Sequence, residues 1–591
     1  MSTITAPAGS TLRGGEFLLR ATSAGDVFTP EDFTEEHRAI ARTTEEFWQS
    51  EVVPKLEAIQ HQEAGVAVGL LRKSAELGLT SVVIPEEYGG MGMDFTSMMI
   101  VAEGVARDGS YSAWHGAHTG IGTLPILFFG TPEQKQQYLP KLATCEMIAA
   151  YCLSEAHAGS DALAARTTAQ LTPDGKNYLL NGQKMWITNG GAADLYTVFA
   201  KVDGKLTAFL VERGFAGVKQ GAEEKKMGIK GSSTCAIYLD NVLVPVENLL
   251  GEVGRGHIIA FNILNLGRLK LGPFAVGGAK NVLAASLAYA QERVAFGKPI
   301  SQFGMIQQKL AQMATYLFAA ESMSYRVEGM VSQAAGPLTW HEPDAGARIL
   351  RAAEEYAIEC SFVKVFASEM LDFVVDEGVQ IHGGYGYHQD YAVERAYRDS
   401  RINRIFEGTN EINRLLATGM LLKRAQKKQL PLVEAVLKLQ GQLLEPLSAG
   451  GAQSSPEQSQ VDQAKKIALL LLGLAYQQFG TAIEEQQEVL AGISDVMMNA
   501  FALESVVLRA AKMAARNAGR NAAAYVALFS HDAMNTIERA ATDVITFCSE
   551  GDTRRTNLAV LRKLTRREVP NAIELRREVA KRLLEAKRYI V

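Results

Sequence analysis

The chain has 591 residues, which is too long for one compact core and predicts about three or four domains. Hydrophobic residues make up 47% of it and the net charge at pH 7 is −5, so the composition is that of a globular enzyme and gives no reason to expect nucleic-acid binding. The cysteines are odd in number, lie far apart and form no cluster with metal-ligand spacing: Cys145, Cys152, Cys235, Cys360 and Cys548. This pattern favours a reducing compartment and no metal, so redox chemistry would need an organic cofactor.

Neither export nor a membrane span is predicted. The first twenty residues contain no apolar signal core. The longest apolar run, Ile467 to Tyr476, is about half of what a bilayer-spanning helix needs. We therefore expect a cytoplasmic protein and leave open a peripheral contact with the inner face of the membrane.

After an N-terminal extension (residues 1–29), residues 30–144 are predicted to be a helical domain. Helix-start signals at Thr29-Pro30 and Thr34 open it. Farther on, Ala113, Gly116 and Ala117 recur on one helical face. Such small residues indicate either close helix packing or a ligand channel, and the sequence does not separate the two.

Residues 145–257 are predicted to be an antiparallel β domain. Short β-rich runs separated by turn residues support this: Thr167–Leu171, Tyr178–Asn181, Leu195–Val202 and Lys205–Val211. Two loops of the domain stand out. Ser154–Asp161 is small and polar, which suits the binding of phosphates by backbone N–H groups, and Lys184–Gly190 sets Trp186 beside hydroxyl and amide groups. Either loop could also be an ordinary hairpin end.

Residues 258–420 return to long helices, in which Arg268 is a cation within an apolar pattern. A basic, amphipathic segment with a linker follows (421–460), and residues 461–591 are predicted to form a C-terminal helical domain. The amphipathic stripe of that segment favours helix packing and leaves contact with anionic lipid open.

The stretch Arg404–Ile412 carries the candidate general base. Glu407 follows two apolar residues and precedes a glycine, and Thr409 is placed to cap the helix that starts after it. A carboxyl group with apolar neighbours is costly to desolvate, so its pKa rises and it becomes able to accept a proton near neutral pH. By itself, however, this pattern is equally that of an ordinary helix-entry glutamate.

Five motifs in this order resemble the acyl-CoA dehydrogenase family over roughly residues 30–420. They are Tyr151–Ser160, Trp186–Thr188, Arg293-x-x-Phe-Gly297, Gln380-x-x-Gly-Gly384 and Phe406–Thr409. The added C-terminal domain resembles the very-long-chain subgroup. The implied fold is mainly α with an inserted antiparallel β domain: a helical N-domain, a β-barrel-like middle domain, a four-helix-bundle C-domain and an additional C-terminal helical domain.

The resemblance also implies a role for each matching residue. Glu407 is the catalytic base, since Gly267, the position that serves in a minority of members, has no side chain. Positions that bind FAD in the family correspond to Tyr151, Cys152, Leu153, Ser154, Gly159, Ser160, Trp186, Ile187, Thr188, Arg293, Phe296, Gln380, Gly383, Gly384, Thr409 and Glu411. Positions that bind the substrate correspond to Ser160, Asn265, Arg268, Gly408, Ala113, Gly116 and Ala117.

The implied reaction is the α,β-dehydrogenation of acyl-CoA thioesters, of long straight chains given the small residues at the pocket floor, to trans-2-enoyl-CoA in fatty-acid β-oxidation. Glu407 removes the α-proton, FAD accepts the β-hydride, and electrons pass to electron-transfer flavoprotein. A homodimer is the expected assembly. Two alternatives stay open: an acyl-CoA oxidase, and a membrane-associated assembly or scaffold protein that retains the dehydrogenase body.

Overall fold

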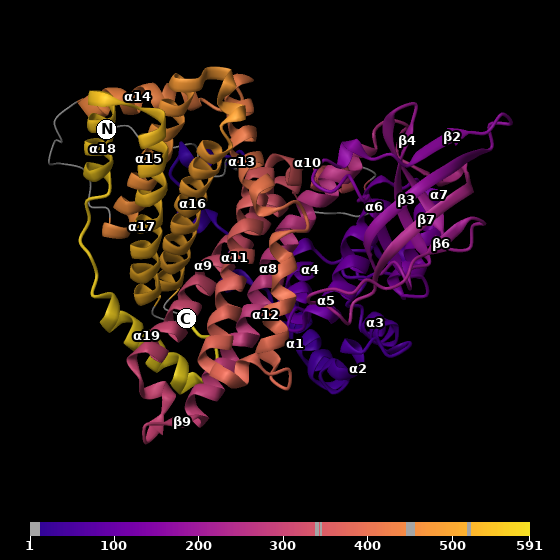
Figure 1. The fold of residues 1–591 in the computed structure, drawn as a ribbon, viewed down its shortest axis with the longest axis horizontal. Helices are drawn as coiled ribbons and strands as arrows, with labels where there is room; N and C mark the ends of the chain where they lie inside the picture. The colour runs from indigo at the N-terminus through magenta and orange to yellow at the C-terminus, as the bar shows by residue number, and fades with distance from the viewer. Residues whose placement is uncertain (1–11, 337–341, 343–344, 445–454, 517–521) are drawn as a thin grey trace.

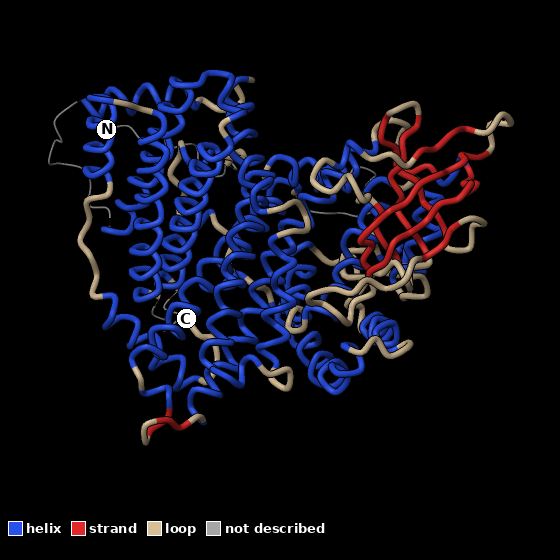
Figure 2. The backbone as a smooth tube through the Cα atoms, in the orientation of Figure 1, coloured by secondary structure: helices blue, strands red, loops and turns tan. Residues whose placement is uncertain are grey.

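The computed structural model describes residues 12–336, 342, 345–444, 455–516 and 522–591. The strands gather at one end of an elongated molecule, and helices make up the rest (Figures 1 and 2). The N-terminal helices lie beside the sheet, and two helical bundles follow in the direction away from it (Figure 1). The predicted fold class is confirmed.

The N-terminal domain is a set of short helices packed around a shared core. They are α1 (Glu35–Phe47), α2 (Leu56–Gln60), α3 (Val66–Glu76), α4 (Phe95–Val105), α5 (Gly109–Ala117), α6 (Leu124–Phe129) and α7 (Pro132–Ala143). The predicted cap at Thr34 is present, since its side chain accepts the N–H of His37. A π-helical turn, η7 (His118–Gly122), follows α5 directly, and such turns occur often at functional sites.

The middle domain is a mixed sheet with the order β6-β7-β3-β2-β4-β5-β8, and β1 pairs with β4. Its strands are β1 (Ala149–Cys152), β2 (Thr168–Leu171), β3 (Asn177–Thr188), β4 (Leu195–Val202), β5 (Lys205–Glu212), β6 (Val218–Gln220), β7 (Thr234–Pro245) and β8 (Leu249–Leu250). Most pairs are antiparallel as predicted, but β4 pairs in parallel with both β1 and β2. The long segment between β1 and β4 provides the crossover that a parallel pair requires.

The predicted loop at Lys184–Gly190 is in fact mostly strand. β3 continues to Thr188 with a bulge between Lys184 and Ile187, where the pairing with β7 shifts. Trp186 sits in this bulge with φ 60°, and its side chain is 57% exposed. A bulge redirects a side chain without ending the strand, which explains why the turn-like sequence belongs to a strand.

The central bundle is built on one long helix, α8 (Gly256–Glu292), which packs against α9 (Gly304–Ala335) and α11 (Ala357–His382). The remaining elements are the hairpin β9 (Val294–Ala295) and β10 (Lys298–Pro299), then α10 (Ala345–Glu355), η11 (Gly383–Tyr387), α12 (Ala392–Ser400), η12 (Arg401–Arg404) and α13 (Asn410–Gln426). The buried face of α8 includes Asn265, Arg268 and Lys270 beside its apolar residues.

The C-terminal domain is a second bundle docked on the first. Its helices are α14 (Leu432–Leu444), α15 (Pro456–Phe479), α16 (Gln487–Ala515), α17 (Ala523–Cys548), α18 (Gly551–Leu564) and α19 (Ala572–Ala586). α16 packs on α9 and α13, and α19 packs on α9. The N-terminal extension lies in the same interface, because the fully buried ring of Phe17 contacts Phe362 of α11 and Phe501 of α16.

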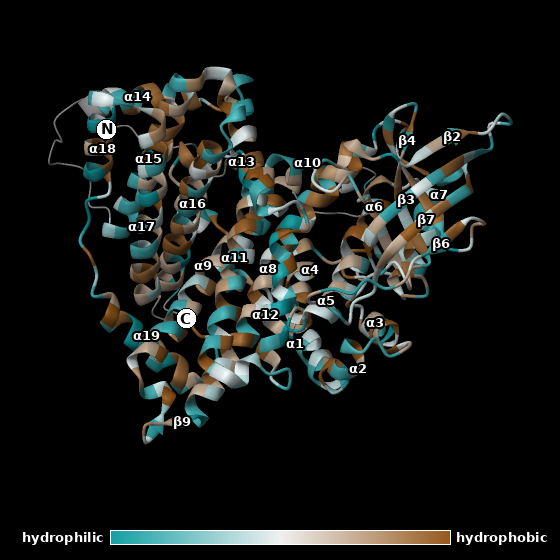
Figure 3. Ribbon diagram, in the orientation of Figure 1, coloured by the Kyte–Doolittle hydropathy of each residue, from teal (hydrophilic) through white to brown (hydrophobic). Residues whose placement is uncertain are grey.

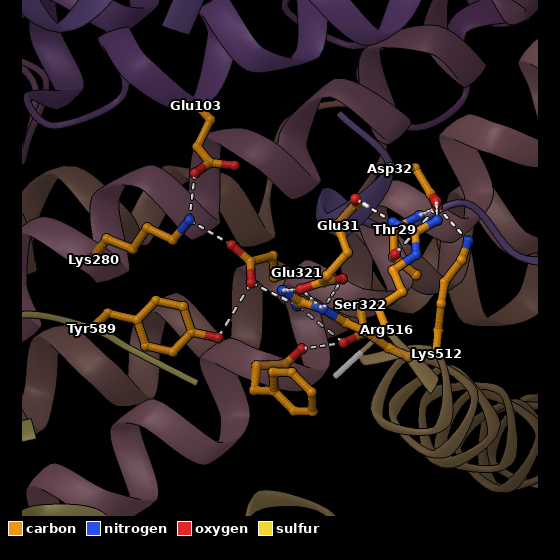
Figure 4. A network of polar contacts seen from close by, with 12 residues as sticks. Thr29, Glu31, Asp32, Glu103, Lys280, Glu321, Ser322, Lys512, Arg516 and Tyr589 are labelled. Atoms are coloured by element: carbon orange, nitrogen blue, oxygen red, sulfur yellow. Dashed lines mark hydrogen bonds and ion pairs between the residues drawn. The ribbon is translucent and has the colours of Figure 1, made fainter. Parts of the chain in front are cut away.

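Buried ion pairs connect the second bundle to the first (Figure 4). Arg509 of α16 binds Glu321 of α9 at 2.6 Å and Glu31 at 2.9 Å. Lys280 of α8 binds Glu321 and, at 2.6 Å, Glu103 of α4. The carboxylate of Glu321 thus has a cation on each side, and its two neighbouring bundles are joined through it.

Within the part of the chain that the structure describes, two helices are long and apolar enough to cross a membrane by length and composition alone: Pro456–Glu485 and Gln487–Ala515. The prediction of no membrane span rested on uninterrupted apolar runs alone and did not cover such helices. The apolar window of the second is 83% buried, so its apolar residues form the core of the C-terminal domain. Figure 3 shows hydrophilic residues interspersed along α15 and α17, which is typical of helices that share one face with a core.

The amphipathic segment packs against α15. Leu432 and Leu439 are buried, and Val436 lies close to Gly473. The side chain of Leu443 and residues 445–454 of the predicted linker lie outside the described residues. The linker ends earlier than predicted, because Ser455 caps α15.

Candidate active site

Glu407 lies in the loop between η12 and α13, in an unusual backbone conformation. Its φ is 56° and that of Gly408 is 79°, so two successive residues are left-handed. Glutamate rarely adopts this conformation, which is costly and is seen mostly at functional sites. Thr409 caps α13 by accepting the N–H of Ile412, as the sequence predicts, so the helix holds the strained loop in place.

The carboxyl group of Glu407 is buried without a hydrogen bond. The residue as a whole is partly accessible, but its Oε2 atom is inaccessible and has no partner among the described residues. Burial raises the pKa of this carboxyl to about 7, against the opposing charges of Arg268, Lys364 and Lys270. A carboxyl group in this state suits proton abstraction near neutral pH.

The cations nearest to Glu407 hold the loop rather than the carboxylate. Arg268 Nε donates to the backbone oxygen of Glu407 at 3.1 Å, and Lys364 Nζ donates to the backbone oxygen of Gly408 at 2.8 Å. Their charges favour ionisation of Glu407 through space and leave its oxygens free to accept a proton.

Gly267 makes room for this carboxyl. A Cβ atom at position 267 would lie 2.8 Å from the carboxyl carbon of Glu407, closer than atoms can approach. Any other residue at this position would therefore force the carboxyl of Glu407 to shift from the place that it occupies.

A cavity of about 440 Å³ extends from Glu407 between α8 and the α5–η7 segment. Ala113, Gly116 and Ala117 line it, which favours the ligand-channel interpretation of this small-residue face. Gly116 also packs closely on Phe274, where an added Cβ would lie 2.7 Å from the ring. On α8 the lining runs from Ile263 to Val282, which corresponds to a length of about 28 Å at about 1.5 Å per residue.

One of the predicted flavin residues of the β domain reaches this cavity. Thr188 lines the cavity, and the exposed ring of Trp186 precedes it by two residues. The side chains of Tyr151, Cys152, Leu153 and Ile187 are buried, whereas Ser154, Gly159 and Ser160 lie at or near the surface. The loop between them is anchored by Glu155, which binds the buried Lys184 at 2.7 Å.

A second group of predicted flavin residues lies elsewhere on the chain. Arg293 lies with its guanidinium 5.5 Å from the ring of Tyr385, next to the exposed Gly383 and Gly384 that follow Gln380. Phe296 is 96% exposed at the tip of the β9–β10 hairpin. Figure 1 places this hairpin far from the β domain. One copy of the chain therefore does not bring the two groups together.

The residues predicted to contact coenzyme A lie beside the base. Asn265 Oδ1 accepts from Arg268 at 2.9 Å, so these two side chains bind each other and the Glu407 loop. Glu411 is exposed in the first turn of α13. Contact of these residues with substrate or cofactor stays a prediction.

Two histidines, His115 and His118, are buried near the cavity. His118 Nε2 lies 3.0 Å from the backbone oxygen of Leu142, and its Nδ1 accepts the N–H of Ala149 at 3.2 Å. Burial lowers the pKa of His118 to about 4 and that of His115 to about 3, so both are neutral near pH 7.

Two more lysines, Lys270 and Lys364, are buried near Glu407 and were not predicted from the sequence. Lys270 interrupts the same apolar helical pattern as Arg268, two residues later, and this interruption was a signal available from the sequence. Lys364 lies on a different helix, α11, and only the fold brings it to the loop of Glu407.

Models of the acyl-CoA dehydrogenase family match most of the chain. The N-terminal domain model matches residues 34–146, the middle domain model 150–242, and two C-terminal domain models 254–421 and 463–563. A probable acyl-CoA dehydrogenase of Bacillus subtilis (strain 168) is 50% identical over 585 residues, covering 98% of each chain. The very long-chain specific mitochondrial acyl-CoA dehydrogenase of Homo sapiens is 44% identical over 351 residues, which are 58% of this chain and 51% of that relative.

Among solved structures, an acyl-CoA dehydrogenase from Bacillus anthracis complexed with FAD superposes with a TM-score of 0.95. It is 48% identical and the match covers 98% of this chain and 100% of that one. The cofactor bound by that relative is the one that the sequence motifs predict. The ordered motifs, the three-part body with its added bundle, and these matches show that this chain belongs to the acyl-CoA dehydrogenase family.

Proposed function

We propose that this protein is an FAD-dependent acyl-CoA dehydrogenase that oxidises long straight-chain acyl-CoA thioesters to trans-2-enoyl-CoA in fatty-acid oxidation. The observation that carries the proposal is the unbonded carboxyl of Glu407 at one end of a long, largely apolar cavity. A thioester seated there would have its α-carbon beside the carboxyl and its acyl chain along α8.

In this proposal Glu407 takes the α-proton of the thioester onto a carboxylate oxygen. The absence of a hydrogen bond to Oε2 keeps that oxygen available, and burial keeps its basicity close to what the reaction needs. The backbone N–H of Glu407 is the donor that we assign to the developing enolate oxygen, and Arg268 holds the next peptide of the loop through the carbonyl oxygen of Glu407.

The residues present fit FAD. Trp186 and Thr188 offer an exposed ring and a hydroxyl at the cavity mouth, and Gly383 and Gly384 leave open space where side chains would stand. When bound, FAD supplies the two-electron acceptor for the β-hydride. Ser154 and Ser160 are the residues that we assign to the flavin side, and Arg293 and Gln380 those that we assign to the adenosine-diphosphate side.

Because the two groups of flavin residues are separated within one chain, we propose a homodimer in which each FAD is held by both copies. The exposed Phe296 and Arg293 would then lie at the interface. A dimer of the FAD-loaded protein in light scattering, reduced to a monomer without FAD when Phe296 and Arg293 are both changed to alanine, would support this arrangement. A stable monomer that retains FAD would exclude it.

Anaerobic titration of the purified protein with butyryl-, octanoyl- and palmitoyl-CoA tests the reaction. We expect palmitoyl-CoA to bleach the flavin absorbance and yield the enoyl product, and the shorter substrates to do so less efficiently. In Glu407→Gln the flavin should remain bound while the rate of bleaching falls by about 10²–10⁴-fold, which is the usual contribution of a general base. A protein that is not bleached by any of the three would contradict the proposal.

Electron-transfer flavoprotein is the acceptor that we propose for the reduced protein. Reoxidation by that partner, with little peroxide formed in air, would support a dehydrogenase. Stoichiometric peroxide without the partner would instead indicate an oxidase.

We place the protein in the cytoplasm. Contact with the inner membrane face would have to use the exposed Val433 and Leu437 of α14, since the other side of this helix packs on α15. Co-sedimentation with anionic liposomes, compared with Val433→Ser/Leu437→Ser, tests for that contact.

A further inference from the structure

Lys270 is an amine buried in the wall of the acyl cavity. It lies three residues after Gly267, so both occupy one face of α8, and Gly267 is the residue against which the carboxyl of Glu407 packs. Only 5% of Lys270 is exposed. Its Nζ atom donates to Thr119 Oγ1 of η7 at 2.8 Å.

This position is unfavourable for an amine. An ammonium group has three donors, and Thr119 is the single hydrogen-bond partner that the described residues offer it. Its other neighbours are mostly apolar: Phe274, Gly120 and the residues of α4 that line the adjoining small cavity, Met98 and Val101. Thr80 and the neutral His115 line that small cavity as well. Burial accordingly lowers the pKa of Lys270 to about 7, and the charge of Glu407 opposes this lowering.

Lys270 differs from the two other cations near the base. Arg268 and Lys364 are bound to backbone oxygens of the Glu407 loop. Lys270 is the one of these three cations that lines the cavity. An acyl chain that enters the cavity displaces water from Lys270 and Glu407 together, which strengthens the interaction between their charges.

We propose that Lys270 is a positioning residue that keeps Glu407 ionised from inside the acyl cavity while an apolar chain fills it. This inference rests on the proposed function, since it assigns Lys270 a part in the same reaction. A straight chain bound along α8 would pass the amine about 4.5 Å beyond the carboxyl, since Lys270 lies three residues after Gly267 and an α-helix rises about 1.5 Å per residue.

The other titratable groups around this pair leave the inference intact. His115 of α5 and His118 of η7 face Lys270 and are neutral near pH 7 because burial lowers their pKa values. Tyr151 of β1 faces Glu407, and burial raises the pKa of its hydroxyl well above the usual value. Cys360 of α11 faces Arg268, and burial raises the pKa of that thiol as well. The charges that act on Glu407 are therefore those of Arg268, Lys364 and Lys270.

The test is the pH dependence of anaerobic flavin reduction by palmitoyl-CoA in Lys270→Met. Methionine fills a similar volume without charge. Removing a cation favours the protonated carboxyl, so we expect the acid limb of the profile to move to higher pH by about one unit. The rate on the acid side should then fall about tenfold, and the rates of variant and wild type should converge at alkaline pH.

Two further variants separate charge from packing. Lys270→Arg keeps a cation and should keep the acid limb close to that of the wild type. Phe274→Leu changes the same cavity wall next to Lys270 and keeps every charge, so any change in its rate should come without the shift of the limb that loss of the cation produces. Bound flavin and the melting temperature establish that each variant is folded, and Lys270→Gln replaces the methionine variant if the latter does not fold.

An acid limb that stays in place in the folded Met or Gln variant would overturn the inference, as would an equal shift in Phe274→Leu. These outcomes are distinguishable from failure of the proposed function. If acyl-CoA does not reduce the wild-type flavin at any pH, the proposed function fails; if it does and the limb is unmoved by the loss of Lys270, the inference alone fails.

Discussion

Two clusters of buried charge in this molecule shift the pKa of a glutamate in opposite directions. Glu321, between the two helical bundles, accepts from Lys280, Arg509 and the hydroxyl of Tyr589, and the two cations hold the pKa of its carboxyl well below the usual range although burial acts to raise it (Figure 4). Glu407 has three cations nearby, Arg268, Lys364 and Lys270, yet its pKa is raised to about 7.

The difference lies in where the cations place their donors. At Glu321 they bind the carboxylate itself, so the ionised form is strongly preferred. At Glu407 the donors of Arg268 and Lys364 bind backbone oxygens, and the carboxylate receives only charge through space. Hydrogen bonding to the carboxylate, more than the number of nearby cations, therefore decides whether a buried acid is a structural anion or a usable base.

The largest expected effect comes from breaking the paired cluster. Arg509→Met leaves Glu31 buried without its cation, and removing one partner of a buried pair typically costs about 3–5 kcal/mol. We expect this loss in the free energy of unfolding measured with urea. The matched control, Arg555→Met, removes an exposed ion pair with Asp552 and should cost about 0–1 kcal/mol. Equal losses in the two variants would contradict the role assigned to burial.

In contrast to the paired cluster around Glu321, ionisation of Glu407 should lower the free energy of unfolding. Glu407 is protonated below its ordinary pKa of 4.5 in both the folded and unfolded states. As the pH rises, the unfolded chain ionises first and the folded state keeps its proton until about pH 7, so stability is lost across this window. The full loss is about 3 kcal/mol at about 1.4 kcal/mol per pKa unit.

Glu407→Gln removes that loss. Its stability relative to the wild type should rise between pH 4.5 and 7 and then level off, as followed by unfolding at matched flavin content. Glu434→Gln, at an exposed position of α14, should show no such trend. A difference between Glu407→Gln and wild type that does not vary with pH would mean that the carboxyl titrates normally.

Gly267→Ala should displace the carboxyl of Glu407 without replacing that residue. The added methyl would lie within 3 Å of the carboxyl and push it out of line with the substrate. We expect about a hundredfold loss in the rate of flavin reduction, the size that a displacement of about 1 Å can cause. Gly419→Ala on α13, where an added methyl meets nothing within 4 Å, is the control and should keep the wild-type rate.

The smallest expected effect is a change in the preferred length of the acyl chain. Ala113→Phe narrows the cavity away from Glu407, so the ratio of kcat/KM for palmitoyl-CoA to that for octanoyl-CoA should fall about tenfold, the order that lost apolar contacts are worth in a pocket. An unchanged ratio would mean that this helical face serves packing alone.

Much of the fold follows from local signals in the sequence. The Thr409 cap and the strand from Leu195 to Val202 occur as predicted, because caps and β-rich runs bounded by turn residues depend on a few neighbouring residues. The parallel pairing of β1 with β4 and the bulge at Trp186 depend on distant partners, and the sequence does not disclose them.

The candidate site likewise has features that the sequence discloses and features that only the fold shows. The motif around Glu407 singles out the proposed base, and burial raises the pKa of its carboxyl in the direction that the apolar pattern indicates. The contact between Gly267 and the carboxyl, and the place of Lys364 behind the loop, join segments that are far apart in the chain. Such contacts come from packing, so only the folded structure shows that the carboxylate is surrounded by cations and bonded to none of them.

The protonation state of Glu407 can be measured directly by difference infrared spectroscopy of the wild type, with Glu407→Gln identifying the band of its protonated carboxyl. The account predicts that this band disappears near pH 7. A band already lost near the ordinary carboxyl pKa of 4.5 would show that Glu407 is a normally titrating acid and would contradict the account.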